Sequence, residues 1–160
     1  MNIKRTTVFL LTFLVLFVGC GNDSANTAKA AGPEWQSYDQ GMKLGRSRSK
    51  HIMVNFYADW CRYCKQMFKE TFADDQVRAE LRKNFVSIKV DTEAQQSLAM
   101  DYSVRGLPTI WFLKSNGEKL APVPGFVPPE QFLNILKYVS AEAYESMSFK
   151  EFMEKGGNKN

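Results

Sequence analysis

The feature that most constrains this fold is the motif Cys61-Arg62-Tyr63-Cys64, which lies three residues after an apolar run at residues 52–57. A short apolar run of this kind predicts a buried strand, and the motif then begins a helix. A cysteine at such a strand-to-helix junction has free backbone N–H groups and a helix dipole that favour its thiolate. Because the thiolate is the nucleophile of thiol–disulfide exchange and a second cysteine can resolve the mixed disulfide, the motif indicates redox chemistry.

The first nineteen residues predict a signal peptide. Lys4 and Arg5 form a positive start, and the apolar run at 8–18 has the length of a signal-peptide core and is short for a membrane span. Gly19-Cys20 then resembles the end of a bacterial lipoprotein signal, which implies cleavage before Cys20 and a diacylglycerol on its thiol. The sequence thus predicts an exported, lipid-anchored chain at the periplasmic or outer face of a membrane.

Two other outcomes for this leader stay open. The sequence Ala28-Lys29-Ala30 has the small-x-small pattern of an ordinary signal-peptidase site, and cleavage there would release a soluble secreted protein. An uncleaved leader would remain as an anchor. Each outcome exports the domain.

Charge and composition exclude several classes of protein. Hydrophobic residues make up 44% and aromatic residues 13% of the chain, which predicts a globular domain. The formal charge is +4, and loss of Lys4 and Arg5 lowers it by two, too little to predict nucleic-acid binding. We interpret the basic cluster at residues 46–50 as a solvated turn. Of the three cysteines, Cys20 is left for the anchor and the other two for chemistry.

The pattern along the chain predicts one α/β domain with a mixed central sheet of four to five strands and helices on both faces. After the signal peptide at 1–19 we expect a flexible tether at 20–33, a domain at 34–147, and a short C-terminal helix and tail at 148–160. Helices are predicted at 35–44, 61–72, 74–82, 93–102, 130–144 and 148–155, and strands at 51–57, 85–90, 110–113 and 120–123. Asn116-Gly117 predicts a hairpin turn.

Three segments in this order resemble the thioredoxin superfamily. Residues 56–65 are similar to its active-site signature, Gly106-Leu107-Pro108-Thr109 is similar to its cis-proline loop, and Gly125-Phe126 is similar to its last turn. Within the superfamily the chain most resembles the periplasmic C-terminal domain of the disulfide-interchange membrane reductase and free-standing exported thioredoxin-like lipoproteins. This resemblance implies a thioredoxin fold and reduction of disulfides outside the cytoplasm.

The resemblance also implies a role for each matching residue. Cys61 would attack the substrate, and Cys64 would resolve the mixed disulfide, so that the two form a redox-active disulfide. Trp60 would shield one side of the pair. Pro108 would be cis and pack against the disulfide, and the backbone of Leu107 would offer hydrogen bonds to a substrate peptide.

Two positions depart from the family by lacking an acid. Many thioredoxins have a buried Asp where this chain has Asn55, and the membrane reductase's domain has an acid where this chain has Phe68. An amide cannot take the proton from the resolving cysteine. We therefore expect Cys64 to resolve mixed disulfides more slowly than in a relative that has the Asp.

The two residues between the cysteines also depart from the family. Arg62 and Tyr63 replace the Gly-Pro of thioredoxin. A positive charge at Arg62 lowers the pKa of Cys61, stabilises the reduced form and predicts a more oxidising couple than that of thioredoxin. Tyr63 is a candidate contact for partner proteins.

We predict no metal site, because zinc needs four ligands and the chain offers only His51 and carboxylates beside the cysteine pair. We also predict no organic cofactor, since thiol–disulfide exchange needs only the two cysteines. The resemblance implies oxidised exported proteins as substrates, apocytochromes of cytochrome c biogenesis among them, and a membrane thiol as electron donor. We expect a monomer. A thiol oxidase and a non-catalytic thioredoxin-like binding or copper-handling module remain as alternatives.

Overall fold

The computed structural model of the chain describes residues 32–157. The predicted signal peptide at 1–19, the predicted lipidation site Cys20 and nearly all of the predicted tether at 20–33 lie outside the described residues. Among the helices of residues 32–157, none combines the length and apolar character that a bilayer crossing requires.

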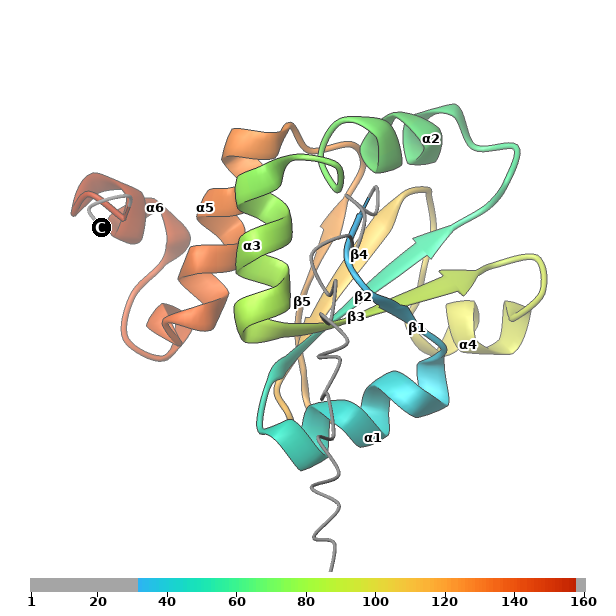
Figure 1. The fold of residues 1–160 in the computed structure, drawn as a ribbon, viewed down its shortest axis with the longest axis horizontal. Helices are drawn as coiled ribbons and strands as arrows, with labels where there is room; N and C mark the ends of the chain where they lie inside the picture. Colours follow the sequence, from blue (N-terminus) through green and yellow to red (C-terminus); the bar gives the residue numbers. More distant parts are fainter. Residues whose placement is uncertain (1–31, 158–160) are drawn as a thin grey trace, which may run out of the picture.

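A five-stranded mixed sheet forms the centre of the molecule, in the order β1-β3-β2-β4-β5. Strands β1, β3 and β2 are parallel, and β4 and β5 are antiparallel to their neighbours. The strands are β1 (Trp35–Gln36), β2 (His51–Tyr57), β3 (Phe85–Asp91), β4 (Thr109–Leu113) and β5 (Lys119–Pro124). The helices are α1 (Tyr38–Arg48), α2 (Arg62–Lys69), α3 (Asp75–Asn84), α4 (Gln96–Asp101), α5 (Pro129–Ser140) and α6 (Phe149–Glu154), with a 3₁₀ turn at Ala143–Glu145. This is the α/β fold that the sequence predicts (Figure 1).

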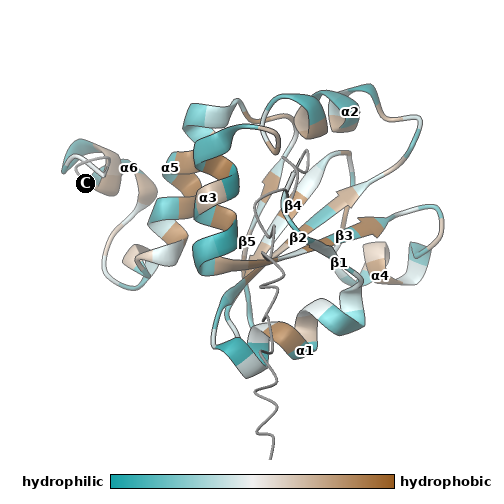
Figure 2. Ribbon diagram, viewed as in Figure 1, coloured by the Kyte–Doolittle hydropathy of each residue, from teal (hydrophilic) through white to brown (hydrophobic). Residues whose placement is uncertain are grey.

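Helices cover both faces of the sheet because the central strands are apolar on both. In β2, Met53 packs with residues of α2, α3 and α5, whereas Ile52, Val54 and Phe56 pack with residues of α1 and α4. All four side chains are fully buried. Figure 2 shows apolar residues gathered on the strands and on helix faces turned toward them. Burial on both sides is typical of a central strand, and β2 leads the chain toward the cysteine motif at its carboxyl end.

Local signals in the sequence explain several boundaries. The carboxylate of Asp74 accepts hydrogen bonds from the backbone N–H groups of Gln76 and Val77, at 2.9 and 3.0 Å, and so caps α3. Pro129 occupies the first turn of α5, where its missing N–H costs nothing. Gly117 adopts a φ of 94° in the predicted turn between β4 and β5. The turn predicted at Asn116-Gly117 is confirmed.

The predicted helix at 35–44 is wrong at both ends, because it continues to Arg48 and so includes most of the basic cluster that we interpret as a solvated turn. Trp35 and Gln36 form β1, which pairs with β3, and α1 begins only at Tyr38. The indole of Trp35 packs edge-on against Phe68 and Phe72, at centroid distances of 5.5 and 5.0 Å. Trp35 and Tyr38 therefore pack in different parts of the core.

Three other predicted helices are shorter than expected. The helix predicted at 61–72 ends at Lys69, the one predicted at 93–102 begins at Gln96, and the one predicted at 130–144 ends at Ser140. Beyond Ser140, α6 turns back so that Phe149 and Phe152 pack against Tyr138 of α5, each at 5.4 Å between centroids.

Candidate active site

Cys61 and Cys64 form a disulfide at the amino end of α2. The chain leaves β2 at Tyr57 and turns through a hydrogen bond from the Cys61 N–H to the Ala58 carbonyl, 3.1 Å long. Cys61 is the N-cap of α2, and its Sγ accepts a hydrogen bond from the Cys64 N–H at 3.1 Å. In the reduced protein, this donor and the positive end of the helix dipole favour a thiolate at Cys61.

The disulfide lies in a small apolar cluster. Cys61 and Cys64 expose 4% and 1% of their surface, and Ala58 is buried beside them. Tyr57 and Leu107 pack against this cluster. The peptide bond between Leu107 and Pro108 is cis, and Pro108 is buried. Two segments that are distant in the sequence therefore enclose the sulfur pair.

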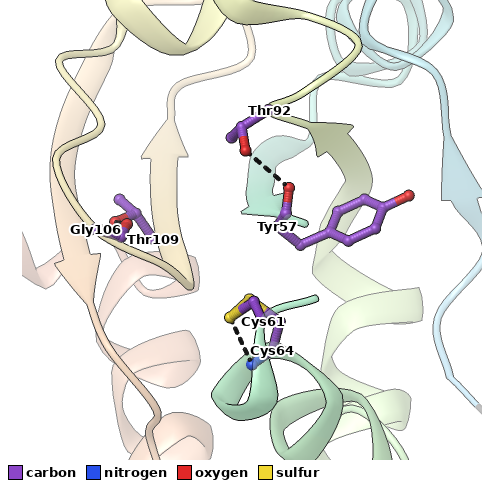
Figure 3. Close-up of a disulfide and its surroundings, with 6 residues drawn as sticks. All are labelled: Tyr57, Cys61, Cys64, Thr92, Gly106 and Thr109. Atoms are coloured by element: carbon purple, nitrogen blue, oxygen red, sulfur yellow. Dashed lines mark hydrogen bonds between the residues drawn. A yellow bond between two sulfur atoms is a disulfide. The ribbon is translucent and has the colours of Figure 1, made fainter. Parts of the chain in front are cut away.

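Hydrogen bonds hold both segments in place (Figure 3). The Thr109 hydroxyl donates to the Gly106 carbonyl at 2.7 Å and closes the loop that carries Leu107. The Thr92 hydroxyl donates to the Tyr57 carbonyl at 3.2 Å and joins the end of β2 to the chain that follows β3. The figure shows the disulfide lying across from Gly106, at the same end of the sheet as Tyr57. A substrate disulfide that approaches this end of the sheet would meet two segments that these hydrogen bonds already hold in place.

Large exposed side chains stand beside the buried disulfide. Trp60 and Tyr63 are 68% and 58% exposed, and Arg62 is exposed as well. The indole N–H of Trp60 donates to the Glu93 carboxylate at 3.1 Å, so this ring has a defined position in spite of its exposure. Exposed aromatic rings beside a small apolar cluster are suited to contact with polypeptide.

Glu93, like Thr92, is a contact residue that sequence reasoning did not single out. It follows β3, and nothing in its local sequence distinguishes it from other surface acids.

Burial, with additional effects of Asp91 and Asp59, raises the pKa of Tyr57 above its usual value, so Tyr57 remains a neutral phenol beside the disulfide.

Asn55 is buried on the same side of β2 as Tyr57, because side chains alternate along a strand. Its Oδ1 has no hydrogen-bond partner. Phe68, the second position at which an acid is missing, packs edge-on against Tyr57, Trp35 and Phe72. An amide and an apolar ring therefore occupy these two positions, and neither can act as a base.

His51 lies at the start of β2, whereas the cysteines follow its end. Its Nε2 is 3.1 Å from the Tyr144 hydroxyl and 3.8 Å from a Glu142 carboxylate oxygen. Within residues 32–157 no three His, Cys, Asp or Glu side chains group in a way that could hold a metal ion.

The sheet order, the cis-proline loop and a cysteine pair at a helix amino end define a thioredoxin-fold protein with a redox-type C-x-x-C site. The chain belongs to the thioredoxin-like domain family, which it matches over residues 38–140. It is 36% identical over 110 residues to the thiol:disulfide interchange protein DsbD of Photorhabdus laumondii, which covers 66% of this chain and 19% of that protein. The DsbD of Yersinia pestis is 38% identical over 104 residues, or 61% of this chain and 17% of that protein. The chain thus spans about a fifth of the length of these relatives.

Solved structures show the same similarity. A thioredoxin from Thermus thermophilus superposes with a TM-score of 0.64 at 30% identity, covering 69% of this chain and 89% of that one. The C-terminal domain of Neisseria meningitidis DsbD, in its reduced form, superposes with a TM-score of 0.54 at 26% identity, covering 62% of this chain and 90% of that one. Together with the disulfide at 61–64, these similarities support a thiol–disulfide oxidoreductase.

Proposed function

We propose that this protein is an exported thiol–disulfide oxidoreductase that reduces disulfides of extracytoplasmic proteins. The observation that carries the proposal is the Cys61–Cys64 disulfide, seated at a helix amino end and enclosed by the cis-proline loop. The similarity to DsbD proteins supports the reducing direction and a periplasmic location. The lipoprotein-type sequence at Cys20 supports a membrane anchor.

In the proposed reaction the Cys61 thiolate attacks one sulfur of a substrate disulfide. A Cys61–substrate bond forms, the substrate S–S bond breaks, and the departing substrate thiolate takes a proton. Cys64 then loses its proton and attacks Sγ of Cys61, which releases the second substrate thiol and restores the Cys61–Cys64 disulfide. Two electrons pass to the substrate, and a membrane dithiol donor returns two to the pair.

Residues around the pair would assist without taking electrons. The backbone of Leu107 would bind the substrate chain in an extended form, while Pro108 presents no N–H to compete at the sulfurs. Trp60 and Tyr63 would contact the substrate on the exposed side. Arg62 would favour the Cys61 thiolate, although its exposure weakens that effect by solvent screening.

The test is reduction of insulin disulfides by the full chain with a dithiol donor. We expect turnover that is lost in Cys61→Ser. In Cys64→Ala the first step should proceed and the second should fail, so that mixed disulfides accumulate and identify the substrates. Cys20→Ser is the matched control and should keep the activity in solution. Full activity of Cys61→Ser would refute the proposal.

Equilibration with glutathione separates reductase from oxidase. Known couples range from about −270 mV for thioredoxin to about −120 mV for the strongest periplasmic oxidant. A potential well above about −150 mV would favour an oxidase of exported thiols that uses the same two cysteines.

A further inference from the structure

A group of basic side chains, which we call the basic pole, lies at the end of the sheet where β2 and β3 begin. Two of its members end α1, one precedes β2, and two lie in the last turn of α3. Figure 2 shows the carboxyl ends of α1 and α3 as hydrophilic. The members of the basic pole are Arg46, Arg48, Lys50, Arg82 and Lys83.

Strand register brings the two halves of the basic pole together. The parallel pairing aligns His51, the first residue of β2, with Phe85, the first residue of β3. The residues just before each strand must therefore be neighbours. The Lys50 ammonium indeed donates to the Arg82 carbonyl at 2.8 Å. Arg48, Lys50 and Arg82 line one cavity of about 110 Å³.

The positive charge of the basic pole is larger than the negative charge that the described residues place beside it. Among residues 32–157, none of its five side chains forms an ion pair with a carboxylate. A helix carboxyl end carries about half a negative charge, so the ends of α1 and α3 together offset about one of five cations. Glu34, which lines the same cavity, offsets another. About three positive charges remain for an external partner.

Near its start, the described chain passes the basic pole. Pro33 and Glu34 line the cavity formed by Arg48, Lys50 and Arg82. A coil of fourteen residues, the length of the predicted tether at 20–33, has a root-mean-square span of about 20 Å. A domain tethered through Cys20 would therefore stay near the bilayer, where the basic pole is within reach of its surface.

The cysteine pair lies at the opposite end of the same strand. The seven residues of β2 separate the two ends by about 20 Å at a rise of about 3.3 Å per residue. Figure 1 shows α2 at the top of the molecule and the end of α1 at the bottom. Contact of the basic pole with a membrane would turn the disulfide toward the surrounding solution.

We propose that the basic pole docks on anionic phospholipid headgroups of the membrane to which the chain is tethered, and so orients the Cys61–Cys64 site away from the bilayer. The docking surface rests on the proposed lipid anchor and not on the proposed redox reaction. Each basic residue at an anionic surface strengthens binding about fivefold. Loss of three of them should therefore weaken docking about 100-fold.

The test measures acetylation of lysine amines in the full chain, purified from membranes of a bacterial host and added to vesicles. Neutral vesicles contain phosphatidylcholine, and anionic ones also contain phosphatidylglycerol. We expect Lys83 to be acetylated at least about tenfold more slowly on anionic than on neutral vesicles, and 0.5 M NaCl to abolish the difference because screening is strong at that salt. Lys69 of α2, which is exposed at the disulfide end, should react equally on both.

Two variants make the test specific to position. Arg46→Gln/Arg48→Gln/Arg82→Gln should lose the protection of Lys83. A control that removes three exposed cations elsewhere, K69Q/K89Q/K150Q, should keep it. Thermal unfolding of both variants checks that each is folded. Circular dichroism identifies an assay temperature at which both variants keep their secondary structure.

Several results would overturn the docking surface. One is equal acetylation of Lys83 on both kinds of vesicle, and another is loss of protection in the control variant. Protection by inorganic phosphate alone would instead define a small-anion site. Failure to bind neutral vesicles would refute the anchor, while the anionic vesicles still report on the basic pole. Insulin reduction by the same preparation tests the redox proposal separately.

Discussion

Replacing Asn55 by Asp should shorten the life of the mixed disulfide. Asn55 is 1% exposed, its Oδ1 has no partner, and it lies on the side of β2 that carries Tyr57, which packs on the cysteine cluster. A carboxylate at this place would be a base where the wild type has only an amide. General-base assistance contributes about 100-fold or more when the base is well placed. We expect resolution by Cys64 to be at least about tenfold faster in Asn55→Asp.

The same substitution should make stability depend on pH, and the sign follows from burial. Burial raises the pKa of a carboxyl above its value in the unfolded chain, so the variant is most stable at low pH and loses stability as pH rises through the folded-state pKa. A rise of about three units costs about 4 kcal/mol once the group is ionised. Since single domains have about 5–15 kcal/mol of stability, the variant should remain folded.

The assay mixes reduced protein with a disulfide peptide, quenches with acid and measures the mixed disulfide by mass spectrometry at several pH values. Asn55→Leu is the control, because it removes the unpaired Oδ1 without adding a base. It should stabilise the fold by about 1 kcal/mol and leave the lifetime unchanged. The reasoning fails if urea unfolding shows the pH-dependent loss in Asn55→Asp, and hence a buried carboxylate, while the mixed disulfide persists as long as in the wild type.

Three further predictions follow from single contacts. Phe72→Ala should lower the free energy of unfolding by about 3–5 kcal/mol in urea titrations, because this ring is fully buried; a loss below 1 kcal/mol would contradict the packing. Glu93→Ala should free the Trp60 indole and slow insulin reduction severalfold, whereas Glu93→Gln keeps an acceptor and should stay near wild type; equal rates in the two would argue against a positioning role. Burial lowers the pKa of His51 below 6.5, so unfolded chains bind more protons and stability falls as pH decreases below about 6.5; urea midpoints should lose part of this slope in His51→Gln.

Sequence predicts the fold where local pattern and tertiary packing agree. The apolar run at 52–57 and the Asn116-Gly117 turn belong to this class, since each depends on residues adjacent in the chain. Strand β1 does not. It has two residues, and its existence depends on pairing with Ser87 of β3 and on the fit of Trp35 against α2, neither of which leaves a local signal.

The candidate site divides in the same way. The order strand, Cys61 and helix is local, so the junction at residue 61 can be predicted from the chain. The contact of Glu93 with Trp60 depends on how the chain leaves β3. Likewise, the interpretation of residues 46–50 as a turn is wrong for 46–48, which end α1, and only the register of β2 and β3 places Arg82 beside Lys50.

The two edges of the sheet restrict how this protein can meet unfolded polypeptides. Proline has no N–H, so positions 122 and 124 of β5 offer no donor to an incoming strand. At the other edge, β1 is only two residues long. If the proposed function is right, these edges would protect the protein from co-aggregating with the unfolded polypeptides that it meets, and would leave extended segments to pair with the backbone beside the disulfide, where they would react and leave.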